Sequence, residues 1–344
     1  MQAFDFGGLD VMPGTRATID LPVSVLSNHT PMTLPVQIVH GRTDGPVLFL
    51  SATVHGDEVL GIEIIRRVLQ HRALKTISGT LMAIPIVNAL GFINHSRYLP
   101  DRRDLNRSFP GSDRGSLASM IADLFLREVV QRSDFGIDLH TAALHRTNLP
   151  QIRTSSLKGR AFELSKAFGA PAILVSSLRE GSMRQAAKEA GVDVLVFEAG
   201  QALRFDEMAI RAGVLGVLRV MVQMGMLKPS AVKPSKVASL VSVLSKWERA
   251  PQGGIYRAHR TIGDVVSQGE AIGFVSDPFG EVETPVLSTM DGIVVGRTNL
   301  PVVNRGDALC HIAEIMGSHD VERKLGTIED ELTMSPLFDE DEIL

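Results

Sequence analysis

Short apolar runs alternate with longer amphipathic segments between residue 46 and about residue 226. Alternation of this kind is typical of strands and helices in a layered α/β sheet. Three of the apolar runs have the length of a strand and show no polar face, so we expect them to be covered on both sides, as parallel strands are. These runs are residues 47–52, 80–87 and 192–197.

Three other segments have the character of helices. Residues 116–132 carry apolar side chains at steps of three and four, which predicts an amphipathic helix. Residues 206–224 also indicate a helix, and residues 59–69 are expected to form one directly after the first predicted strand. The predicted fold class is therefore α/β, with a mixed, largely parallel central sheet and flanking helices.

The chain changes character after residue 227. Residues 228–235 contain two prolines, two lysines and two serines, a composition typical of a connection between domains. We therefore expect a first domain over residues 1–235, a β domain over residues 236–316 and an acidic tail over residues 317–344. The acidic residues near the end of the tail are Asp339, Glu340, Asp341 and Glu342.

The β domain contains an internal repeat. Residues 254–272 match residues 292–309, with an offset of 38 positions at the start and 37 at the end. Two such half-motifs resemble the flattened β barrel of the biotinyl and lipoyl carrier domains. Carriers need a lysine between the halves, and residues 247–323 contain none, so covalent attachment of biotin or lipoate is excluded there. We expect the barrel to be structural or to shape the substrate site.

Composition and charge argue against several classes of protein. The chain of 344 residues has a formal net charge of −4, the opposite of the bias expected for a nucleic-acid binder. No stretch approaches the roughly 18 apolar residues of a membrane span, and no signal-peptide pattern is present, so we expect an unexported protein that does not bind membranes. Cys310 is the only cysteine, so a metal site must use histidine and carboxylate ligands, and a reducing cytoplasm is the expected location. Homo-oligomer formation is left open.

A histidine and a glutamate follow the first predicted strand. Residues 52–58 are Ala-Thr-Val-His-Gly-Asp-Glu, so His55 and Glu58 lie three positions apart at the turn into the predicted helix. Open α/β sheets bind ligands at the carboxyl ends of their strands, where a nitrogen and a carboxylate oxygen at this spacing can face one zinc ion. The pair alone is a weak signal, because most such pairs are polar surface residues.

Two further apolar runs end in residues that suit the same site. Residues 135–140 end in His140, a candidate third ligand, with Asp138 two positions before it. Asp138 either orients a ligand histidine or serves as a cap or salt-bridge partner, and we favour the second interpretation. Residues 192–197 are followed by Glu198, a candidate general base, because a carboxylate beside zinc can take a proton from water and pass it to the departing amine. The plainer alternatives are a core histidine and a solvated glutamate.

A loop over residues 97–111 is rich in turns and cations. Four positive charges within eleven positions suit a small anionic ligand better than a phosphate backbone. Arginine and Asn106 together can clamp a carboxylate, while another arginine stabilises a tetrahedral oxyanion. A solvated loop is the alternative. The four arginines are Arg97, Arg102, Arg103 and Arg107.

The order of these motifs resembles that of the succinylglutamate desuccinylase/aspartoacylase family, whose members are relatives of the zinc carboxypeptidases. The resemblance extends over roughly residues 46 to 200, and the β domain also matches the layout of the family. It implies a zinc carboxypeptidase-like catalytic domain. The motifs are His-Gly-Asp-Glu at 55–58, Asp-Leu-Asn-Arg-Ser-Phe-Pro-Gly at 104–111, Asp-Leu-His at 138–140 and Glu-Ala-Gly at 198–200.

The resemblance also implies a cofactor and the roles of particular residues. One Zn²⁺ per chain would be held by His55, Glu58 and His140, with catalysis by Glu198. Substrate binding would fall to Asn106 and Arg107.

The resemblance leaves the roles of the remaining arginines open. An arginine before the Asn-Arg pair helps to polarise the scissile carbonyl in the family, and both Arg97 and Arg103 qualify here. We favour Arg97, because Tyr98 follows it, and keep Arg103 as a candidate substrate-binding residue. For a further substrate-binding arginine before the catalytic glutamate, Arg184 and Arg179 are both candidates.

Three hypotheses for the function follow. The leading one is a zinc-dependent deacylase that hydrolyses an N-acyl amino acid or a similar small anionic amide. The second is a metallocarboxypeptidase that acts on peptides, and it is less favoured because the barrel of the family narrows the entrance. The third is a non-catalytic metal-binding scaffold, against which the presence of Glu198 argues.

Overall fold

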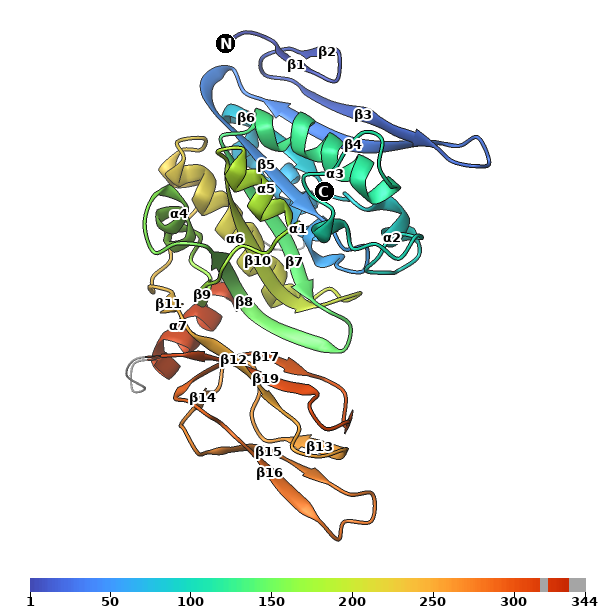
Figure 1. Cartoon of the computed structure of the whole chain (residues 1–344). Coiled ribbons are helices and arrows are strands. Elements are labelled where there is room, and N and C mark those ends of the chain that lie inside the picture. The colour runs from blue at the N-terminus through green and yellow to red at the C-terminus, as the bar shows by residue number, and fades with distance from the viewer. Residues whose placement is uncertain (316–320, 334–344) are drawn as a thin grey trace.

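The computed structural model describes residues 1–315 and 321–333. Its centre is a large mixed sheet (Figure 1) in which four adjacent strands run parallel in the order β10, β7, β5, β6. Every residue of β7 is buried, because helices cover both faces of the sheet there. The bounds are β5 (Thr43–Ala52), β6 (Ser78–Ile84), β7 (Phe135–Ala142) and β10 (Asp193–Gln201).

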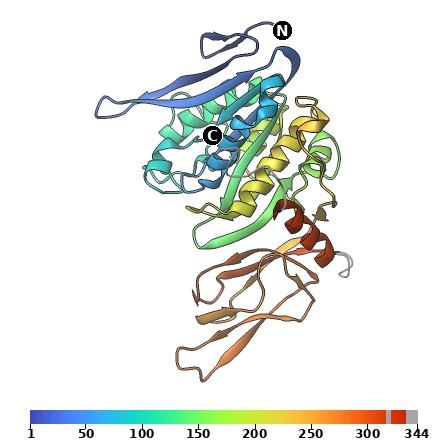
Figure 2. The ribbon, with the colours of Figure 1, turned by 180° about the vertical axis from the view of Figure 1, so that it is seen from behind.

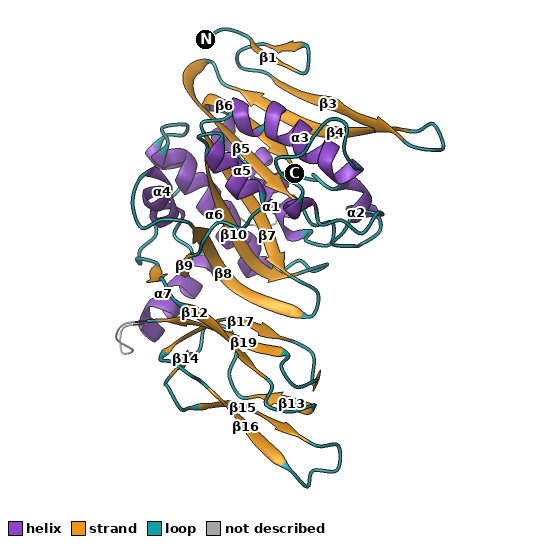
Figure 3. Ribbon diagram, in the orientation of Figure 1, coloured by secondary structure: helices purple, strands orange, loops and turns teal. Residues whose placement is uncertain are grey.

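Further strands extend the sheet on both sides, as the orange arrows of Figure 3 show. Beyond β10 lies β8 in antiparallel orientation, and β9 and β11 follow β8 in parallel. Beyond β6 lie β4 and β3, both antiparallel to their neighbours, and β1 and β2 form a separate hairpin. The bounds are β1 (Phe4–Phe6), β2 (Leu9–Val11), β3 (Arg16–Val25), β4 (Pro31–His40), β8 (Arg146–Thr154), β9 (Ala172–Val175) and β11 (Leu240–Ser242).

Helices cover the two faces of the sheet (Figure 2). On one face α1, α4 and α6 bury apolar side chains such as Ile64, Phe168 and Leu218 against the strands, and α7 packs on α6. On the other face α3 and α5 enclose a second core with Phe49 and Phe125. The bounds are α1 (Leu60–Gln70), α2 (Ala89–Ile93), α3 (Leu117–Glu128), α4 (Arg160–Phe168), α5 (Met183–Glu189), α6 (Glu207–Gln223) and α7 (Val321–Thr333).

The predicted α/β fold, with a mixed central sheet and flanking helices, is confirmed. Several boundaries differ from the sequence prediction. The β5 strand begins at Thr43 and not at residue 47, and β10 continues to Gln201, so Glu198 lies within the strand and not after it. The strand expected over residues 80–87 ends at Ile84, because Pro85 follows and cannot donate to a ladder of hydrogen bonds. The helix expected over residues 116–132 ends at Glu128, and a short 3₁₀ helix, η3 (Val130–Arg132), completes the segment.

The C-terminal strands form two sheets, and the expected closed barrel is not confirmed. One set, with β12, β19, β17 and β14, continues the central sheet, because β17 pairs with β8. The other set is a separate sheet in the order β16, β15, β13, β18, packed against the first through Val275, Val294 and Ile312. The bounds are β12 (Ser245–Arg249), β13 (Gly254–Ala258), β14 (Val265–Val266), β15 (Ala271–Ser276), β16 (Glu283–Leu287), β17 (Gly292–Thr298), β18 (Val302–Val303) and β19 (Ala308–Glu314).

The domain boundaries after residues 235 and 316 stay predictions. The β11 strand pairs with β9 of the first predicted domain, and α7 of the predicted tail packs on α6. The acidic residues 339–342 lie outside the described residues. No helix in the described ranges combines the length and the apolar character that crossing a membrane requires.

A matched pair of helical glycines tests the packing of α6. Gly216 lies against the ring of Phe168, which a methyl group would overlap, whereas Gly326 in α7 has open space beside it. We expect Gly216→Ala to lower the free energy of unfolding by about 1–3 kcal/mol through overpacking. Gly326→Ala should be neutral or should raise it by up to about 1 kcal/mol, since alanine is the better helix former. Urea unfolding midpoints measure both, and equal effects would contradict the packing described.

Candidate active site

A tight turn after β5 presents the first two candidate ligands. Thr53 adopts a left-handed φ of 58°, which is unusual for a β-branched residue, and its carbonyl accepts a hydrogen bond from the Asn88 N–H at 2.9 Å. A side chain at Gly56 would collide with the backbone of α2, so glycine is required at this close approach. The turn therefore holds His55 and Glu58 at the carboxyl end of β5, just before α1 begins.

His55, Glu58 and His140 form one buried cluster. Their nearest side-chain donor atoms all lie within 4.8 Å of one another, and none of the three residues is more than 5% exposed. Glu58 bridges the two rings, with Oε1 2.7 Å from His55 Nδ1 and Oε2 2.7 Å from His140 Nδ1. The predicted strand ends thus bring these three side chains together.

A second carboxylate lies behind each histidine ring. His55 Nε2 is 3.2 Å from Asp104 Oδ1, and His140 Nε2 is 2.5 Å from Asp138 Oδ2. Ser51 on β5 donates a hydrogen bond to the other oxygen of Asp138 at 2.7 Å. Asp138 therefore lies where a carboxylate can orient a ring, and the same contact makes it an ion-pair partner of His140, so the structure is compatible with both the orienting and the salt-bridge interpretations.

The donor set fits a zinc ion. Two imidazole nitrogens and one carboxylate are a common protein ligand set of catalytic zinc, and ligand histidines usually present their second nitrogen to a carboxylate. In this structure both Nδ1 atoms face Glu58 and both Nε2 atoms face Asp104 or Asp138. His55, Glu58 and His140 are therefore the residues that could hold the metal.

The charges of the cluster favour an ionised carboxylate. Burial alone would raise the pKa of Glu58, but the nearby His55 and His140 hold it well below its usual value. Burial lowers the pKa of His140, yet the carboxylates of Asp138 and Glu58 outweigh it and leave the pKa well above the usual value. A low pKa favours the ionised form of Glu58, in which a carboxylate binds a cation, whereas His140 must give up its proton before its ring can bind one.

Glu198 lies next to this cluster on β10. In the parallel register of β10 and β7 it is the direct partner of His140, so both side chains point to the same face at a strand separation of about 5 Å. Asn148 on β8 donates a hydrogen bond to Glu198 Oε2 at 3.0 Å, and Arg153 Nε lies 3.4 Å from Oε1. The register of β10 shifts directly after Glu198, where the strand bulges.

The two candidate arginines of the loop, Arg97 and Arg103, have different surroundings in the structure. Arg97 reaches the cluster, with its guanidinium 3.2 Å from Glu58 Oε1 and 3.2 Å from Asp104 Oδ2. The side chain of Arg103 is 60% exposed and pairs with Asp101 at 3.2 Å. Arg97 is therefore the one that contacts the metal-ligand candidates.

Asn106 and Arg107 lie in η2 (Leu105–Arg107), next to Asp104. The Asn106 side-chain oxygen accepts a hydrogen bond from the Met183 N–H at 2.9 Å, which ties the loop to the start of α5. Arg107 is exposed and donates to the backbone carbonyl of Asn106. A cavity of about 550 Å³ opens beside Arg107 and Phe109, facing the segment before α5.

Sequence reasoning missed three residues of the site, namely Asp104, Asn148 and Arg153. Asp104 was present in the loop motif but carried no assigned role, although it contacts both His55 and Arg97. Asn148 and Arg153 reach Glu198 only through the antiparallel pairing of β8 with β10, for which the sequence contains no local signal.

Arg184 and Arg179 were the open candidates for a further arginine. Burial, together with the nearby charges of Arg153 and Arg179, lowers the pKa of Arg184 to about 10, while Glu198 opposes this shift. Arg184 donates hydrogen bonds to the carbonyls of Ser176 and Ser177. Arg184 is thus within electrostatic reach of Glu198.

The chain is similar to known proteins over most of its length. A model of the succinylglutamate desuccinylase/aspartoacylase catalytic domain matches residues 44–224, which include all the candidate residues above. The N-alpha-acetyl-L-2,4-diaminobutyric acid deacetylase of Halomonas elongata is 29% identical over 297 residues, which make up 83% of this chain and 86% of that protein.

Solved structures are similar over most of the chain. A succinylglutamate desuccinylase/aspartoacylase from Rhodobacter sphaeroides has a TM-score of 0.77 and 24% identity, covering 88% of this chain and 96% of that one. The product-bound ectoine utilization protein EutE (DoeB) from Ruegeria pomeroyi has a TM-score of 0.76 and 22% identity, covering 87% and 95%. At these identities the two structures show a shared fold.

Proposed function

The chain belongs to the succinylglutamate desuccinylase/aspartoacylase family, and from this premise we propose that it is a zinc-dependent deacylase. It hydrolyses the amide bond of an N-acyl amino acid or a similar small anionic amide. The observation that carries the proposal is the buried cluster of His55, Glu58 and His140 with Glu198 as the cross-strand neighbour of His140.

One zinc ion per chain would be held by His55, Glu58 and His140. When bound, it supplies Lewis acidity at the amide carbonyl and lowers the pKa of a water molecule towards about 7. Asp104 orients the ring of His55, and Asp138 orients the ring of His140, each through the Nε2 atom of the histidine. Arg97 places a positive charge beside Glu58, where it can donate to the carbonyl oxygen as negative charge develops there.

Glu198 moves the proton. Its carboxylate takes a proton from the attacking water and then delivers it to the nitrogen of the departing amine. Asn148 and Arg153 each contact one of its two oxygens, so the carboxylate is held in one orientation against β8. These two side chains are positioning residues for Glu198.

The arginine loop recognises the substrate. Arg107, with Asn106 beside it in η2, binds a carboxylate of the substrate. N-acetyl amino acids are the first compounds to test, since the Halomonas elongata relative is named as a deacetylase of N-alpha-acetyl-L-2,4-diaminobutyric acid. Turnover of peptides in place of N-acyl amino acids would favour the carboxypeptidase hypothesis.

A cytoplasmic location belongs to the proposal and rests on Cys310, a buried free thiol.

Removal of a ligand should abolish metal binding. We expect His140→Ala to lose stoichiometric zinc, and Asp138→Asn to bind zinc about 10- to 100-fold more weakly, because the ring of His140 loses its orienting carboxylate. Glu63→Gln is the control, since Glu63 pairs with Arg66 and Arg67 on α1. Titration calorimetry with zinc measures all three. Full zinc occupancy in His140→Ala would refute the assigned ligand set.

Replacement of the base should separate metal binding from turnover. Glu198→Gln removes the proton acceptor, so we expect kcat for an N-acetyl amino acid to fall about 10²- to 10⁴-fold with unchanged zinc content. Glu281→Gln, in the turn between β15 and β16, is the control for loss of one carboxylate. Release of free amine gives the rate, and unaltered turnover in Glu198→Gln would rule out the mechanism.

A third variant tests the positioning of Glu198. Asn148→Ala removes one charge-assisted hydrogen bond, and we expect kcat to fall about tenfold while KM and zinc content stay close to wild type. Asn299→Ala is the matched control, because the Asn299 side chain donates to Thr147 of β8 and to Gln201 of β10 but has no hydrogen bond to Glu198. Equal losses of kcat in the two variants would show that Asn148 acts only on the stability of β8.

A further inference from the structure

A large groove lies at the edge of the sheet opposite the metal cluster. It has a volume of about 1160 Å³ and is lined by the amino ends of β5 and β6, the end of α1 and the segment after α6. The cluster of His55, Glu58 and His140 lies at the carboxyl ends of the same parallel strands. The groove is therefore separate from the proposed active site.

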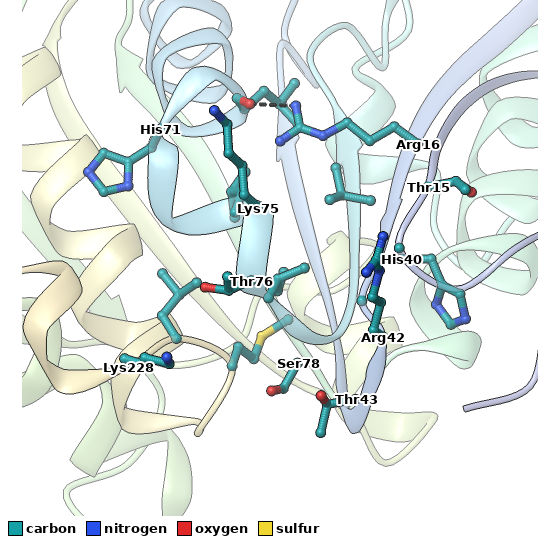
Figure 4. A pocket seen from close by; sticks show the side chains of 18 of the residues that line it. Thr15, Arg16, His40, Arg42, Thr43, His71, Lys75, Thr76, Ser78 and Lys228 are labelled. Atoms are coloured by element: carbon teal, nitrogen blue, oxygen red, sulfur yellow. Dashed lines mark hydrogen bonds between the residues drawn. The ribbon is translucent and has the colours of Figure 1, made fainter.

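The groove gathers positive charge from four separate segments (Figure 4). None of its lining residues is Asp or Glu, although the whole chain has a net charge of −4. The hydroxyl groups of Thr43, Thr76 and Ser78 also face the groove (Figure 4). Its lining cations are Arg16, Arg42, Lys75 and Lys228.

The ends of helices explain only part of this charge. Cations are common near the carboxyl ends of helices, where they bind free carbonyls. Arg16 does so, donating to the carbonyl of Leu69 at 2.7 Å. The exposed side chains of Arg42, Lys75 and Lys228, in contrast, have no hydrogen bond or ion pair within residues 1–315 and 321–333. Three cations therefore remain available to a ligand.

The Arg42 side chain lies close to the backbone of Gly14. A side chain at position 14 would collide with the side chain of Arg42. Because glycine has no side chain, Arg42 can lie directly against the backbone of residue 14. Gly14 has a φ of 80°, a conformation that glycine adopts without strain. A side chain at position 14 would therefore displace Arg42, one of the cations that line the groove.

We propose that this groove is a binding site for a small polyanion that carries two or more phosphate or carboxylate groups. Uncompensated cations attract such groups through charge-assisted hydrogen bonds. The three unpaired cations come from different segments, and the volume is that of a site for an organic molecule, so a single small anion would leave most of it unfilled. The proposal does not depend on the deacylase activity.

Titration calorimetry at constant ionic strength tests the site with pyrophosphate, citrate and inorganic phosphate as probes. We expect saturable binding of pyrophosphate or citrate, at least tenfold tighter than that of inorganic phosphate. Tighter binding of pyrophosphate would indicate a preference for phosphate groups, and tighter binding of citrate a preference for carboxylate groups. Arg42→Gln and Lys75→Gln should each weaken binding about three- to tenfold, since each removes one charge-assisted contact in a solvent-exposed groove. Lys246→Gln, on β12, should leave it unchanged.

Binding measurements on further variants distinguish this groove from other sites that could bind an anion. Binding of the polyanion should persist in Glu58→Gln, because an anion held by a metal at the cluster would be lost there. Gly14→Ala should weaken binding by displacing Arg42, whereas Gly8→Ala, at a similar positive φ with open space around it, should not. Absence of saturable binding, or equal affinity in wild type, Arg42→Gln and Lys75→Gln, would overturn the proposal.

Discussion

The buried carboxylate of Glu58 is the constraint on which the rest of the site depends. A carboxylate that is only 2% exposed is tolerated when charged and hydrogen-bonded partners surround it. Those partners come from distant parts of the chain, since His55 follows β5, His140 lies on β7 and Arg97 belongs to the loop after α2. The parallel pairing of β5 with β7 is what brings them together, so the register of two strands determines the chemistry.

The C-terminal strands take part in this arrangement. Asn148 on β8 is paired with Gly296 of β17 on one side and holds Glu198 of β10 on the other. The proposed base, Glu198, therefore lies between the parallel strands of the core and the strands of the predicted β domain. The β domain thus helps to support the site.

Much of the site was predictable, because its residues follow directly after recognisable apolar runs. His55, His140 and Glu198 each stand at the carboxyl end of such a run, and parallel strands bring those ends to one edge. Asp104 and Asn148 were not predictable, since their contacts depend on a loop conformation and on an antiparallel pairing across 50 residues. The internal repeat indicated two similar halves, but it contained no sign that β17 pairs with β8, which leaves the barrel open. The basic groove was missed because its cations are far apart in the sequence.

The most direct test of the account is a zinc titration of the metal-stripped protein, with release of free amine from an N-acetyl amino acid as the readout. The account predicts that the stripped protein is inactive and that activity rises linearly and reaches a plateau at one zinc ion per chain. Full activity of the stripped protein, or a plateau well above one equivalent, would contradict it.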